Sequence, residues 1–237
     1  MIKIENVDVY GWEAAIRGAR NPMNSWDKSD STCDDCRRDC PTRDCMECEV
    51  YVGTNDHKLL CGLANAGPDH GKFMRMITVA LDITAPLYWF KEFDTYKVGT
   101  VANSCSTMHK IHAKEFTHED FSHEHLLDDG SGPQVECGQC GTFGTVGPTG
   151  LLELTISVLN HYRNMFLLSK DKRYWWQLIQ LLPSSYNQRR TILLNYQVLK
   201  TMYHARKNHK LDEWREFCQW IETLPYSELI TGGHNRD

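Results

Sequence analysis

Two closely spaced cysteine pairs are the first residues in this sequence whose spacing indicates chemistry. The pairs are Cys33-x-x-Cys36 and Cys45-x-x-Cys48, and their spacing is typical of a tetrahedral zinc site with four thiolate ligands. The surrounding segment is polar and cannot bury a core, so a structural metal would stabilise it. We therefore predict zinc at these four cysteines, with unpaired surface thiols or disulfides as alternatives. Cys40 is left over, and a third pair, Cys137-x-x-Cys140, could replace either of the first two.

A second set of candidate residues lies near the C-terminus at helical spacing. Asn195, Leu199, Met202 and Arg206 would share one face of a helix. An arginine on the same face as core leucines needs a partner, because an unpaired charge is costly to bury. That partner is either an anionic or planar ligand, which a guanidinium holds with two hydrogen bonds, or an acid such as Glu213.

A polar run over residues 91–108 is rich in Thr, Ser, Asn and Gly. Backbone amides and hydroxyls in such a run suit the binding of a phosphate or a base. The run contains neither a Walker A pattern nor G-x-G-x-x-G, so a capped, exposed turn is the alternative. Five histidines follow it without helical or hairpin spacing, and we interpret them as part of a solvated face: His109, His112, His118, His123 and His125.

The elements that would position these residues are strands early in the chain and helices late. Ile77, Val79, Leu81 and Ile83 alternate strictly, which predicts a strand, and residues 2–9 alternate more weakly. Residues 84–86 are expected to end the strand and begin a helix over 86–97. Other helices are expected over 12–19, after a cap at Asn55, over 151–166, up to Leu182, over about 188–209 and over 211–221. The fold class is therefore α/β, with early strands forming a sheet and a helical C-terminal half.

Composition limits the class of protein. Hydrophobic residues make up 41% and charged residues 24% of the 237 positions, which is ordinary for a soluble globular chain. The sequence shows neither a membrane-length apolar run nor a signal peptide, and its net charge of −5 argues against a nucleic-acid binder. We predict a cytoplasmic protein with one domain over 1–237, carrying a Cys-rich insertion at about 25–50 and a His/Gly-rich insertion at about 109–150.

Short blocks in a consistent order give the chain a family resemblance. Ala19-Arg20 resembles an A-R-V-S segment, Gly67 to Phe73 resembles G-H-x-x-x-F, and Ala85-Pro86 precedes the signature. Leu182-Pro183, Asn195 and Arg206 resemble an L-P, N and R spacing. In this order the blocks resemble the flavin-dependent thymidylate synthases (thymidylate synthase complementing proteins), specifically homologues from phages and their bacterial hosts.

The family signature, R-H-R-x-x-S-x-N-E-x-S-x-R-Y, aligns with residues 95–108. Lys97 stands at the last arginine of R-H-R, while Thr100 and Cys105 stand at serines and Thr107 replaces an arginine. The resemblance implies that the nucleotide is bound by Arg206, Cys105 and Ser104. It implies that the flavin is bound by Lys97, Tyr96, Thr95, Asn103 and Asn195. No catalytic residue is assigned, because the family uses no cysteine nucleophile and Cys105 would only line the site.

The resemblance implies methylation of a pyrimidine deoxynucleotide, of the dUMP to dTMP type or a close variant. FAD would carry the redox chemistry, with NADPH and methylenetetrahydrofolate as co-substrates. Because the family builds its flavin site between subunits, a homotetramer is expected. The alternative is a non-catalytic nucleotide-binding or zinc-stabilised interaction protein that kept the fold while its signature changed.

Overall fold

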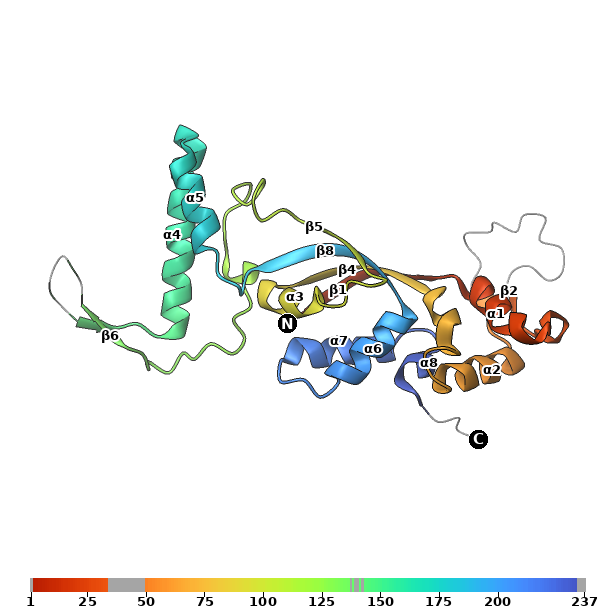
Figure 1. Ribbon diagram of the computed structural model, residues 1–237. Coiled ribbons are helices and arrows are strands. Elements are labelled where there is room, and N and C mark those ends of the chain that lie inside the picture. Colours follow the sequence, from red (N-terminus) through yellow and green to blue (C-terminus); the bar gives the residue numbers. More distant parts are fainter. Residues whose placement is uncertain (1, 34–49, 137, 139–140, 142, 234–237) are drawn as a thin grey trace. The chain divides into compact units, whose positions relative to one another are not determined.

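The computed structural model describes residues 2–33, 50–136, 138, 141 and 143–233 (Figure 1). The chain divides into two compact units, each assembled from separate stretches. Unit 1 contains Met1–Lys3, Thr84–Phe93 and Ser104–Arg190, and unit 2 contains Ile4–Ile83, Asp94–Asn103 and Thr191–Asp237. The single domain with two insertions stays a prediction.

A four-stranded sheet has the strand order β1-β4-β8-β5. Its strands are β1 (Lys3–Tyr10), β4 (Thr78–Pro86), β5 (Val101–Ser104) and β8 (Asn187–Asn195). The strand predicted from strict alternation is confirmed as β4, because Ile77, Val79, Leu81 and Ile83 are all buried.

Two short antiparallel hairpins accompany the sheet. In the first, β2 (Thr32–Cys33) pairs with β3 (Val50–Tyr51), with Thr32 opposite Tyr51. In the second, β6 (Gln134–Glu136) pairs with β7 (Phe143–Thr145), with Val135 opposite Gly144.

Unit 2 contains helices from both halves of the chain. They are α1 (Trp12–Arg20), α2 (Thr54–Asn65), α6 (Tyr196–Arg206), α7 (Asp212–Glu222) and α8 (Glu228–Thr231), with the 3-10 helices η1 (Asn21–Met23), η2 (Trp26–Lys28) and η3 (Gly71–Arg75). Helix α6 packs against α7, α8 and η3. The predicted inward face of α7 is confirmed, since Trp214, Phe217, Cys218 and Ile221 are buried.

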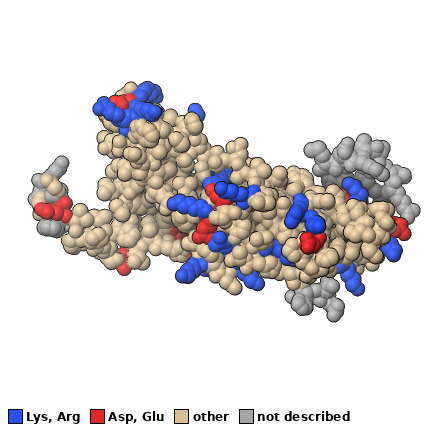
Figure 2. All heavy atoms as spheres, in the orientation of Figure 1, with Lys and Arg blue, Asp and Glu red and all other residues tan. Residues whose placement is uncertain are grey.

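Unit 1 contains α3 (Leu87–Phe93), η4 (His118–Asp120), α4 (Pro148–Ser169) and α5 (Lys172–Leu181). Helices α4 and α5 pack side by side (Figure 1) over a core that includes Ile111, Phe116, Phe121, Leu152, Leu159 and Leu178. On the outer surface of the pair, Leu151, Leu154 and Leu168 are 56%, 55% and 84% exposed. On the face shown in Figure 2, a group of charged side chains lies at the end of the pair where the two helices are joined.

The prediction of a helix over 188–209 is wrong for its first half and correct for its second. Residues 187–195 form β8, and α6 begins only at Tyr196. Asn195 is therefore not on a helical stripe with Leu199, Met202 and Arg206. It caps α6 instead, because its side-chain oxygen accepts a hydrogen bond from the Val198 N–H at 3.0 Å, as asparagine does at helix starts.

Two other helix boundaries differ from the prediction. Pro86 still belongs to β4, and α3 covers only Leu87–Phe93. At the start of α3 the Leu87 and Tyr88 N–H groups donate to the carbonyls of Tyr186 and Ser184, each at 3.0 Å. Asn55 does not cap α2, whose N-cap is Gly53. The Asn55 N–H instead donates to the Asp30 carboxylate at 2.8 Å.

Among the helices in the described parts of the chain, none is both long and apolar enough to cross a membrane.

Candidate functional site

Arg206 ends α6 and contacts two aromatic side chains of unit 2. Its Nε donates a hydrogen bond of 2.9 Å to the Tyr96 hydroxyl, 110 positions away in the sequence. Its guanidinium carbon lies 4.9 Å from the ring centroid of Trp214 and 5.7 Å from that of Tyr96. Cation–π contacts of this kind favour a fixed orientation of the planar group. The structure thus brings together Arg206 and a residue of the aligned signature.

The start of α6 lies against the same polar segment. At Gly99 the backbone has a φ of +82°, and a Cβ there would lie 2.8 Å from Nδ2 of Asn195. The hydroxyl of the nearby Thr100 is buried and has no hydrogen-bond partner within the described residues. A buried polar atom without a partner is uncommon in a native protein. This end of the segment therefore fits an anionic ligand.

The two ends of α6 can serve different ligand groups. Asn195 and Arg206 are separated by the 11 residues of the helix, which corresponds to about 16 Å at 1.5 Å per residue. They cannot contact one small group together. The assignment of Asn195 to the cofactor and of Arg206 to the nucleotide stays a prediction.

Lys97 and Thr95 are exposed in the turns between α3 and β5, and Asn103 is exposed within β5. The Lys97 carbonyl accepts a hydrogen bond of 3.4 Å from the Thr100 N–H, which closes the turn around Gly99. The Lys97 side chain extends from this turn into solvent. Its position suits contact with an anion, and its role stays a prediction.

Ser104 and Cys105 belong to unit 1, so their surroundings are described within that unit. Both are exposed. The Cys105 N–H donates to the Arg189 carbonyl at 2.9 Å, and the Cys105 carbonyl accepts from the buried side-chain amide of Gln188 at 2.7 Å. Gln188 in turn accepts a hydrogen bond of 3.0 Å from Nε of Arg190. Gln188 thus fixes the backbone at Cys105, and no sequence motif marked it.

Two other cysteines are buried thiols in unit 2. Burial raises the pKa of the Cys61 thiol, and burial together with Glu222 raises that of Cys218 to about 11. Because the thiolate is the reactive form, neither is suited to be a nucleophile.

A buried ion pair joins α1 to α2, and it involves the arginine of the A-R block. Arg20 is 5% exposed and Asp56 is 0% exposed, and Nε of Arg20 lies 2.5 Å from Oδ1 of Asp56. The other guanidinium nitrogens of Arg20 donate to the carbonyls of Ser25 and Lys28, each at 3.0 Å. The arginine therefore holds the segment after α1 in place.

The second oxygen of Asp56 binds the same segment further along. It accepts hydrogen bonds from the hydroxyls of Ser29 and Ser31, each at 2.6 Å, and from the N–H groups of Asp30 and Ser31. Burial alone would raise the pKa of Asp56, but the bonds from Ser29, Ser31 and Arg20 outweigh it and the pKa is lowered. Asp56 therefore has a structural role, which is to hold the segment after α1.

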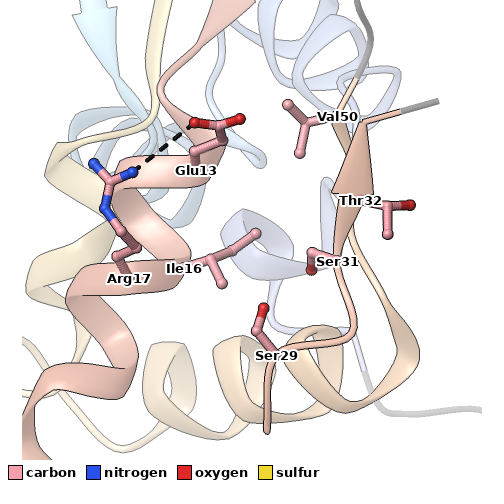
Figure 3. A pocket seen from close by; sticks show the side chains of 7 residues that line it. All are labelled: Glu13, Ile16, Arg17, Ser29, Ser31, Thr32 and Val50. Carbon is pink, nitrogen blue, oxygen red and sulfur yellow. Dashed lines mark ion pairs between the residues drawn. The ribbon is translucent and has the colours of Figure 1, made fainter. Parts of the chain in front are cut away.

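A pocket of about 210 Å³ lies beside this network (Figure 3). Ile16, Ser29 and Val50 line it, and Glu13 and Arg17 form an ion pair of 3.9 Å at its side. None of the residues predicted to bind nucleotide or flavin lines this pocket. We therefore do not assign the nucleotide to it.

The predicted zinc ligands cannot be placed. Cys36, Cys45 and Cys48 lie outside the described residues, and of Cys33 only the backbone is described. Within the parts of the chain that the structure does describe, no group of three or more His, Cys, Asp or Glu side chains could hold a metal ion. The interpretation of the histidines as a solvated face agrees with the structure, since all but the half-buried His112 are exposed.

Comparison with solved structures identifies the fold. Flavin-dependent thymidylate synthase ThyX from Helicobacter pylori, crystallised with FAD and dUMP, matches with a TM-score of 0.62 and 14% identity, over 97% of this chain and 96% of that one. The UMP/dUMP methylase PolB from Streptomyces cacaoi, bound to 5-Br dUMP, matches with a TM-score of 0.60 and 15% identity, over 98% and 95% of the two chains. No family model and no curated protein sequence matches this chain. The predicted flavin-dependent thymidylate synthase-like fold is confirmed.

Proposed function

We propose that this protein is an enzyme that methylates a pyrimidine deoxynucleotide, of the dUMP to dTMP type or a close variant, with FAD as its redox cofactor. The observation that carries the proposal is the position of Arg206. It is held by Tyr96, a residue of the aligned signature, and by Trp214, in a chain whose fold matches a thymidylate synthase and a UMP/dUMP methylase.

Arg206 would bind the pyrimidine. A guanidinium offers only hydrogen-bond donors, so it would bind the carbonyl oxygens of uracil and stabilise negative charge that develops on them. That Ser104 and Cys105 contact the nucleotide is proposed from the family resemblance alone. No side chain is assigned as a nucleophile.

The segment from Thr95 to Thr100 and the start of α6 fit the flavin. Its pyrophosphate needs cations and N–H or hydroxyl donors, which Lys97 and Thr100 would supply, with Thr95, Asn103 and Asn195 beside them. Bound FAD would supply the redox chemistry, with NADPH as hydride source and methylenetetrahydrofolate as carbon donor. Because these co-substrates are cytoplasmic, we place the protein in the cytoplasm.

Replacing Lys97 tests the flavin site. Lys97→Met should weaken FAD binding by roughly ten- to a hundred-fold, because a hydrogen bond to a charged group contributes about 1.5–3 kcal/mol. Lys97→Arg should retain binding. FAD fluorescence and the flavin absorbance of the purified protein measure both effects.

Lys58→Met is the matched control, since Lys58 is an exposed lysine of unit 2 on α2, and it should leave FAD affinity unchanged. If titration of the wild-type protein shows no saturable FAD binding, the flavoenzyme proposal fails.

The second candidate is a non-catalytic nucleotide-binding or zinc-stabilised interaction protein. The observation in its favour is the altered signature, in which Thr107 stands at the position of an arginine. Such a protein would bind dUMP in the absence of FAD and show no methyl transfer.

We further propose a homotetramer, because α4 and α5 present an apolar surface. Leu151, Leu154 and Leu168 are exposed there, with Trp176 and Leu181 at 42% and 45% exposure. Exposed apolar patches of this kind mark protein interfaces.

Light scattering coupled to size-exclusion chromatography should give about four times the chain mass. Glu substitutions at Leu151 and Leu154 should lower that mass, and a wild-type monomer at micromolar concentration would contradict the proposal.

A further inference from the structure

Tyr96 binds Arg206 through the inner nitrogen of the guanidinium. Its hydroxyl accepts the hydrogen bond from Nε at 2.9 Å. This hydrogen bond limits the rotation of the guanidinium within its own plane.

Trp214 supports the same guanidinium on its face. Its side chain is fully buried on α7, and the guanidinium carbon lies 4.9 Å from its ring centroid. The rings of Tyr96 and Trp214 also contact each other, with centroids 6.2 Å apart at an angle of 63°. Trp214 thus limits tilting of the guanidinium plane, and Tyr96 limits its rotation.

These contacts differ from the role that the family resemblance implies for Tyr96. Position 96 aligns with the histidine of the R-H-R signature, which implies a flavin contact. In the structure the hydroxyl is bound to Arg206 and the ring packs on Trp214. A flavin contact would make FAD affinity depend on the Tyr96 hydroxyl, whereas a contact to Arg206 would make dUMP affinity depend on it.

We propose that Tyr96 is a positioning residue for nucleotide binding, which holds the Arg206 guanidinium in the orientation that binds the pyrimidine. The inference rests on the proposed function. Its physical basis is preorganisation, because a side chain that is already oriented loses less conformational entropy when the ligand binds.

Removal of the Tyr96 hydroxyl tests the proposal with dUMP and FAD as separate probes. Tyr96→Phe should weaken dUMP binding by roughly ten-fold, the effect of one hydrogen bond to a charged group, and leave FAD affinity unchanged. Isothermal titration calorimetry measures both. The matched control is Tyr203→Phe, which removes a hydroxyl on α6 that donates to Glu222 at 2.7 Å. It should change neither affinity.

A double-mutant cycle separates positioning from a general structural effect. In an Arg206→Ala background, titrated to millimolar dUMP, Tyr96→Phe should have no further effect on dUMP affinity. An equal decrease in both backgrounds would overturn the proposal, as would weaker FAD binding with unchanged dUMP binding. If the wild-type protein does not bind dUMP, the proposed function fails and this inference fails with it. If it does and Tyr96→Phe binds equally well, only this inference fails.

Discussion

Asp56→Ala is expected to lower the free energy of unfolding by about 3–5 kcal/mol, because it leaves the buried Arg20 guanidinium without its counterion. It also removes the acceptor for the hydroxyls of Ser29 and Ser31. For a chain of this length the melting temperature should fall by roughly 6–20 °C, at about 2–4 °C per kcal/mol. Urea unfolding of wild type and variant measures the difference directly.

Glu13→Ala provides the control on the same part of unit 2. The Glu13–Arg17 pair is 3.9 Å long, and its side chains are 64% and 69% exposed, so its removal should cost less than about 1 kcal/mol. A cost for Asp56→Ala as small as that of the control would contradict the structural role of the buried pair.

The Asp56 network also predicts how the stability of the protein changes at acidic pH. The pKa of Asp56 is lower in the folded protein than the value of about 3.9 for an unfolded chain. Its contribution to stability is therefore complete above about pH 3.9 and is lost as the pH falls through the lower folded value. Below that pH, the free energies of unfolding of Asp56→Ala and wild type should differ less than they do at neutral pH.

Arg206→Ala is expected to raise the dUMP dissociation constant by about 100-fold or more. The guanidinium would form two charge-assisted hydrogen bonds to the pyrimidine, and each contributes about 1.5–3 kcal/mol. The variant also removes the cation–π contact with Trp214 and the hydrogen bond to Tyr96, which contribute about 0.5–2 and 1.5–3 kcal/mol, so the protein should lose some stability but remain folded at 25 °C. Calorimetric titration with dUMP and a thermal melt of the same sample give both quantities.

Two variants make the Arg206 result specific. Arg206→Lys keeps the charge but not the planar group, so its affinity should be intermediate. Arg215→Ala removes another arginine of unit 2, which pairs with Asp212, and should bind dUMP normally. A large decrease in the stability of Arg206→Ala with dUMP binding intact would make Arg206 a structural residue instead.

The parts of the fold that could be predicted are those in which one periodicity dominates. In β4, buried and less buried residues alternate without exception from Thr78 to Ala85, and the prediction from this pattern was correct. In β8 the pattern is ambiguous, because Leu193 is apolar but 44% exposed, and the run Ile192-Leu193-Leu194 also fits a helix. The β-branched Thr191 and Ile192 favour a strand, and Asn195 is a good helix cap, so both signals were present in the sequence.

The candidate site could be predicted only in part, for a different reason. The order of short blocks indicated Arg206 and residues 95–105, and the structure places Tyr96 beside Arg206. Trp214, which contacts Arg206, belongs to no motif. Gln188 and Cys105, which are joined by a hydrogen bond, are far apart in the sequence. Such contacts depend on the packing of α7 on α6 and of β8 on β5, which no local pattern specifies.

The backbone conformation of Gly99 limits which substitutions this part of the sequence can accept. Its φ of +82° disfavours any side chain, and a Cβ would also approach Cγ2 of Val198 at 3.1 Å, so no single compensating substitution restores the position. The preceding residue, Val98, is 91% exposed and is free to vary. Among close relatives we therefore expect an invariant glycine next to a variable position, together with an asparagine at the cap of α6. This pair would allow alignment of remote homologues in which the R-H-R signature is no longer recognisable.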